Sequence, residues 1–141
     1  MRWRIGMFVL LIAMGVVGCT SLGEQMDLLD EPLREVKVSY FENYGGMNEE
    51  TFLSFDSAED LELFREAITT AVQSSAEISS DPDYDLQVTY NSNDGELPTH
   101  GIHMWAGEAV TFLYIADEDV YAATPQMSKK LNDLLKKAPN S

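Results

Sequence analysis

An amphipathic helix set among strand-type segments is the feature that most constrains the fold of this chain. Apolar residues recur at helical spacing through about residue 75, at Leu61, Phe64, Ile68, Ala71 and Val72. Ser57 and Asp60 match a capping box that begins this helix. Because a lone helix of this length is marginal in water, its apolar stripe must cover a sheet.

The other apolar segments predict that sheet. Six of them have the alternation or the continuous apolar character of strands, over residues 34–44, 51–55, 84–91, 99–105, 109–115 and 120–124. A second helix is expected from Thr124-Pro125, which supply an N-cap and a first helical position. The order β-β-α-β-β-β-β-α predicts an α+β domain, in which an antiparallel sheet of about five to six strands is covered on one face by two helices.

The N-terminus has the composition of an export signal. Arg2 and Arg4 precede a short apolar run from Ile5 to Val17. As a helix this run is about 20 Å long, too short to cross a hydrocarbon layer of about 30 Å. We therefore expect a signal peptide over residues 1–18, a tether over residues 19–32 and a single folded domain over residues 33–141.

The apolar run ends in Val16-Val17-Gly18-Cys19, which resembles the lipobox of bacterial lipoproteins, and Cys19 is the only cysteine. The resemblance implies that the Cys19 thiol receives a diacylglyceryl group and that a signal peptidase cleaves between Gly18 and Cys19. Two acyl chains anchor a protein stably where one binds marginally. The predicted location is the cell membrane, facing outside the cytoplasm, with the membrane as a partner; the alternatives are an ordinary signal peptide or a buried core cysteine.

The charge distribution excludes one class of partner. The formal net charge is −15 at pH 7, and between Val38 and Ser128 the only basic residue is Arg65. Such a surface repels phosphate groups, so no nucleic-acid partner is expected. Cations, basic peptides or basic proteins are favoured electrostatically, unless the acidic residues serve only to solvate the surface.

Two candidate metal motifs fail on spacing, so neither a metal nor another cofactor is predicted. Asp81, Asp83 and Asp85 open like a calcium loop, but Leu86 and Ser92 stand where an EF-hand needs Gly and Glu. His100 and His103 form an H-x-x-H pair near Glu108. In a strand, residues three apart face opposite sides of the sheet, which argues against a shared metal.

Phe41, His103 and Trp105 form a candidate binding surface on the outer face of the predicted sheet. Exposed aromatic side chains in such a position stack on sugar rings or anchor a peptide. The alternative is a second small core, or an aromatic side chain packed under a loop.

Three longer segments resemble the YhfM-like family of lipoproteins from bacilli. They are NEETFLSFDSAEDLELFREAI (residues 48–68), DPDYDLQVTYN (residues 81–91) and HGIHMWAGE (residues 100–108). The similarity runs from about Val36 to Leu135. The resemblance implies an extracytoplasmic lipoprotein without assigned catalytic residues, so it supports the location and adds no chemistry.

The chain lacks the usual catalytic motifs. No G-x-S-x-G elbow and no glycine-rich phosphate loop occurs, and the single thiol is the predicted lipid attachment site. We therefore expect no catalytic residues and a non-catalytic domain that binds a protein or a cell-wall component at the envelope. The alternatives are a small envelope enzyme or accessory hydrolase using a carboxylate pair, and a cation-binding, stress-associated lipoprotein.

Overall fold

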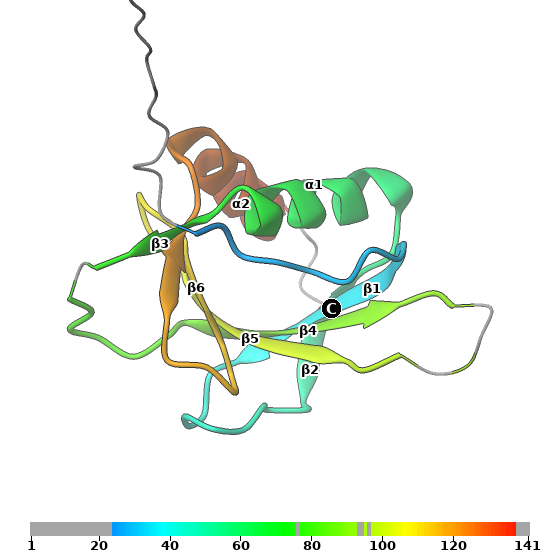
Figure 1. Cartoon of the computed structure of the whole chain (residues 1–141), viewed down its shortest axis with the longest axis horizontal. Coiled ribbons are helices and arrows are strands. Elements are labelled where there is room, and N and C mark those ends of the chain that lie inside the picture. Colours follow the sequence, from blue (N-terminus) through cyan, green and yellow to red (C-terminus); the bar gives the residue numbers. More distant parts are fainter. Residues whose placement is uncertain (1–23, 76, 93–94, 96, 138–141) are drawn as a thin grey trace, which may run out of the picture.

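Seven antiparallel strands in one sheet and two helices make up the computed structural model, which describes residues 24–75, 77–92, 95 and 97–137 (Figure 1). The strands are β1 (Leu33–Tyr40), β2 (Thr51–Phe55), β3 (Val72–Ser74), β4 (Tyr84–Tyr90), β5 (His100–Trp105), β6 (Thr111–Tyr114) and β7 (Val120–Ala122), and the helices are α1 (Ala58–Thr69) and α2 (Pro125–Lys137). The sheet order is β2-β1-β4-β5-β6-β7-β3. The α+β class with an antiparallel sheet is therefore confirmed.

The core lies between the sheet and the two helices, which cover the same face of the sheet (Figure 1). Val36 and Val38 of β1 pair with Val88 and Leu86 of β4, and all four side chains are fully buried. From α1, Phe64 contacts Phe55 of β2, with ring centroids 5.3 Å apart. Neither helix in the described part of the chain is long and apolar enough to cross a membrane.

The sheet has seven strands instead of the expected five to six, because the predicted helix was too long. α1 ends at Thr69, where the side chains of Thr69 and Thr70 bond back to carbonyl oxygens of the last turn. Val72, expected on the core face of the helix, instead begins β3 and pairs with Ala122 of β7. β3 has only three residues, too few to show the two-residue period of a strand. In the sequence, Ala71 and Val72 therefore fit the apolar spacing of the preceding helix and are assigned to it.

Residues 24–32, which we call the strap, pack against the domain although the sequence places them in the tether. Gln25 forms a β-bridge with Val72, and the Met26 side chain is only 1% exposed. The Arg65 guanidinium of α1 donates hydrogen bonds to the carbonyl oxygens of Leu29 and Glu31. The predicted signal peptide, Gly18 and Cys19 lie outside the described residues.

Candidate binding pocket

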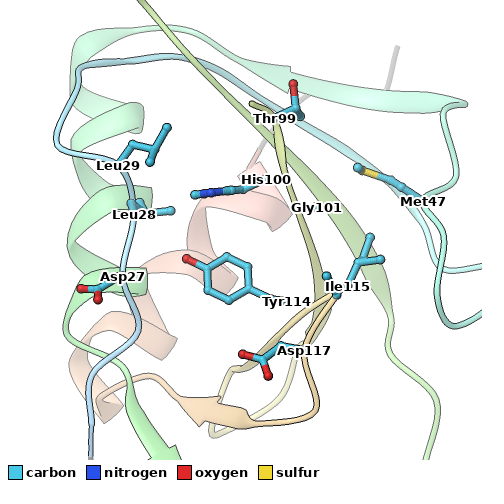
Figure 2. Close-up of a pocket in the computed structure, with 11 residues that line it drawn as sticks. Asp27, Leu28, Leu29, Met47, Thr99, His100, Gly101, Tyr114, Ile115 and Asp117 are labelled. Atoms are coloured by element: carbon cyan, nitrogen blue, oxygen red, sulfur yellow. The ribbon is translucent and has the colours of Figure 1, made fainter. Parts of the chain in front are cut away.

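A pocket of about 650 Å³ opens where β6 stops short of the beginning of β5 (Figure 2). β6 pairs with β5 only from Ile102, which lies opposite Tyr114, the last residue of β6. His100 and Gly101 therefore have β4 on one side and no strand on the other. The strap and the turn after β6 border the open side and form the walls of the pocket.

The walls are mostly apolar. Leu28 and Leu29 of the strap lie on one side, and Met47 and Ile115 lie on the other (Figure 2). Gly101 permits a close approach on that second side: a Cβ atom there would lie 2.7 Å from Ile115 Cδ1 and 2.8 Å from Met47 Cε, so the ends of these two side chains would have to move. Such a surface binds the apolar part of a ligand by removing it from water.

A chain of hydrogen bonds connects the strap to the pocket histidine. The Leu29 N–H donates to the Tyr90 hydroxyl over 3.3 Å, and that hydroxyl lies 2.7 Å from His100 Nδ1. Burial lowers the pKa of His100, so the imidazole is neutral at pH 7. Burial also raises the pKa of Tyr90, which keeps its proton, so the Tyr90 hydroxyl and His100 Nδ1 form a hydrogen bond between two neutral groups.

The Tyr114 hydroxyl is the unusual polar group of the pocket. The oxygen is buried and has no hydrogen-bond partner among the described residues. Burial, Tyr90 and Asp27 raise the pKa of this phenol, which therefore stays neutral. Figure 2 shows the hydroxyl directed toward the strap. Leaving such a group unpaired costs about 1–3 kcal/mol.

Two carboxylates, Asp27 of the strap and Asp117 of the turn after β6, also border the pocket (Figure 2). Both side chains are exposed. The described residues that line the pocket include no Lys and no Arg. The pocket therefore combines an apolar interior with a negative rim.

The predicted binding surface of Phe41, His103 and Trp105 is not exposed as expected. His103 and Trp105 are 1% and 8% exposed, and Phe41 is half-buried. The connection between β1 and β2 covers His103, whose ring lies 5.1 Å from that of Phe41 and 5.5 Å from that of Tyr44. The Trp105 Nε1–H donates to the Ser80 carbonyl oxygen over 2.9 Å. Phe41 and His103 thus belong to a second small core, whereas Trp105 packs against the segment that contains Ser80.

A buried acid–histidine pair lies at the centre of this second core. His103 Nδ1 is 2.7 Å from Asp85 Oδ1, and Asp85 Oδ2 accepts from the Asn48 N–H over 2.9 Å. His103 Nε2 is buried and has no hydrogen-bond partner among the described residues. Asp85 is itself 0% exposed, so the pair holds the β1–β2 connection on the sheet and is closed to solvent.

The two histidines lie on opposite faces of the sheet, as predicted. His100 contacts Tyr90 and Tyr114, whereas His103 contacts Asp85 and Phe41. The carboxylates of the D-x-D-x-D segment also differ in role. Asp83 accepts a hydrogen bond from the Ala106 N–H, whereas Asp85 is paired with His103. Within the described ranges, no group of three or more His, Cys, Asp or Glu side chains is arranged to hold a metal ion.

Comparison with known proteins assigns the family. The sequence model of one protein family, described as YhfM protein, matches residues 40–140. The chain belongs to the YhfM family. No curated protein and no solved structure matches it. The matched range of this YhfM family member begins at the end of β1 and includes every pocket residue outside the strap.

Acidification is expected to destabilise the domain through His100. Its folded-state pKa lies below the ordinary value of about 6.5, so between these two values the unfolded chain binds more protons. This contribution to stability is complete above about pH 6.5 and is lost as the pH falls toward the folded-state pKa. Urea unfolding of the wild type and of His100→Gln, measured from pH 7.5 to pH 5, should show a weaker pH dependence in the variant. Equal pH dependence in both proteins would contradict this assignment.

Proposed function

We propose that this chain is a lipid-anchored, non-catalytic binding domain that faces outside the cytoplasm and takes the apolar part of a small ligand into the pocket beside the strap. The observation that carries the proposal is the mostly apolar pocket, which has the polar groups of His100, Asp27 and Asp117 at its border. A mostly apolar cavity with a few convergent polar groups is the usual form of a small-molecule site.

The position of the strap relates the pocket to the proposed anchor. Four residues lie between Cys19 and Glu24, where the strap begins, so the two Cα atoms are five steps and at most about 18 Å apart. With Cys19 acylated, the pocket wall formed by Leu28 and Leu29 lies close to the membrane surface. An amphiphile that partitions into the membrane would therefore reach the pocket easily.

The chemistry of the pocket favours binding over catalysis. The described lining residues include no Ser, Cys or Lys that could act as a nucleophile, and the two carboxylates that border the pocket, Asp27 and Asp117, are exposed to solvent. His100 Nδ1 is engaged in a hydrogen bond with the Tyr90 hydroxyl, so this nitrogen is not available to act as a base on a ligand. The other histidine, His103, is closed to solvent.

One experiment in cells that express the full chain tests the two halves of the proposal. Labelled palmitate is expected in the wild type and in Ser21→Ala, and not in Cys19→Ser. In membranes from the wild-type cells, an uncharged dodecyl alcohol carrying a diazirine should crosslink to peptides from the strap or from residues 114–117. Ala116→Trp, which fills the pocket, should remove at least most of this crosslinking.

Ile78→Trp is the matched control for the pocket, because Ile78 is exposed and does not line it. Its crosslinking should equal that of the wild type. Palmitate in the Cys19→Ser chain would refute the anchor. The proposed binding in the pocket would be refuted if the crosslinks were spread evenly over the domain, or if Ala116→Trp did not reduce them.

A further inference from the structure

The rim of the pocket indicates the class of ligand, an inference that rests on the proposed function. Asp27 and Asp117 come from segments far apart in the sequence and border the same opening (Figure 2). We propose that the pocket selects an amphipathic organic cation, whose alkyl or aryl part lies against Leu28 and Ile115. Its ammonium group lies between the two carboxylates.

Both carboxylates line the same pocket as Tyr114. Each is close enough to Tyr114 to raise the pKa of its phenol, in addition to the effect of burial. An ammonium group beside Tyr114 pairs with two negative charges, and the neighbouring phenol ring adds a cation–π contact.

No positive charge competes for these carboxylates within the pocket. The described lining residues include neither Lys nor Arg, and His100 is neutral because burial lowers its pKa. Arg65, the only basic residue between Val38 and Ser128, is engaged with strap carbonyl oxygens. An anionic ligand would instead meet two carboxylates on a chain of net charge −15.

A pair of photoreactive probes tests the charge preference. The probes are a dodecylamine with a diazirine in its alkyl chain and the uncharged N-acetyl derivative of the same amine. In membranes containing the full chain, the amine should crosslink to the strap or to residues 114–117 about fivefold more than its derivative, since each exposed carboxylate contributes a modest attraction. The double variant Asp27→Asn/Asp117→Asn should bring this ratio close to one.

The double variant Asp30→Asn/Glu118→Gln is the matched control. It removes the same charge from neighbouring exposed positions that do not line the pocket, and it should keep the wild-type ratio. Equal crosslinking of both probes in the wild-type pocket would overturn the cation preference and leave the pocket proposal standing. The same holds for a ratio that Asp27→Asn/Asp117→Asn does not change. Crosslinking of neither probe would overturn the proposed function itself.

Discussion

Replacing Asp85 with alanine is expected to lower the free energy of unfolding by about 3–5 kcal/mol. The substitution leaves His103 Nδ1 and the Asn48 N–H without their carboxylate partner in a site closed to water. A loss of this size is a large share of the about 5–15 kcal/mol that stabilises a typical domain. Urea unfolding followed by circular dichroism measures it, and the β1–β2 connection should become susceptible to proteolysis.

Two further variants separate the buried pair from a general effect of lost charge. Asp81→Ala removes an exposed carboxylate of the same segment, so its effect should stay within about 0.5 kcal/mol. His103→Phe removes the other partner. In the double variant Asp85→Ala/His103→Phe, the two losses of unfolding free energy should not add, because the two side chains contact each other. Equal unfolding midpoints for Asp85→Ala and Asp81→Ala would contradict the structural role assigned to the pair.

The elements that the sequence predicted well are those with a local signal. Ser57 begins α1 as expected, with its hydroxyl accepting from the Asp60 N–H over 3.2 Å. Thr124 does the same for α2, accepting from the Met127 N–H over 3.1 Å. Caps and periodic apolar faces depend on neighbours a few residues away, so they can be read without knowing the tertiary structure. The family resemblance, carried by three contiguous segments, was confirmed for the same reason.

The features that the sequence did not predict depend on contacts between distant residues. Alternation in β5 indicated that His103 and Trp105 share a face, but it could not show that the β1–β2 connection and Ser80 cover that face. The pocket was not predicted for the same reason, because Leu28, Met47 and Tyr114 come from separate parts of the chain. Tyr114 lies in an apolar run, and nothing in the sequence indicated that its hydroxyl would be buried without a hydrogen-bond partner among the described residues. Only the packing of the strap brings these residues together.

Replacing Phe64 with alanine is the second change with a large expected effect, about 3–5 kcal/mol of lost stability. Phe64 is 0% exposed and contacts Phe55 of β2, so the substitution opens a cavity between α1 and the sheet. α1 also carries Arg65, which holds the strap and therefore one wall of the pocket. Urea unfolding measures the loss of stability, and crosslinking of the uncharged dodecyl probe should fall with it.

Glu62→Ala is the matched control for Phe64→Ala, because Glu62 is exposed on the same helix and alanine preserves helix propensity. Its unfolding midpoint and its crosslinking should stay near those of the wild type. If Phe64→Ala lowers stability but leaves crosslinking unchanged, the strap keeps its position without a firmly packed α1. In that case Met26 and the β-bridge between Gln25 and Val72 position the pocket wall, and the expected coupling between helix packing and ligand binding is wrong.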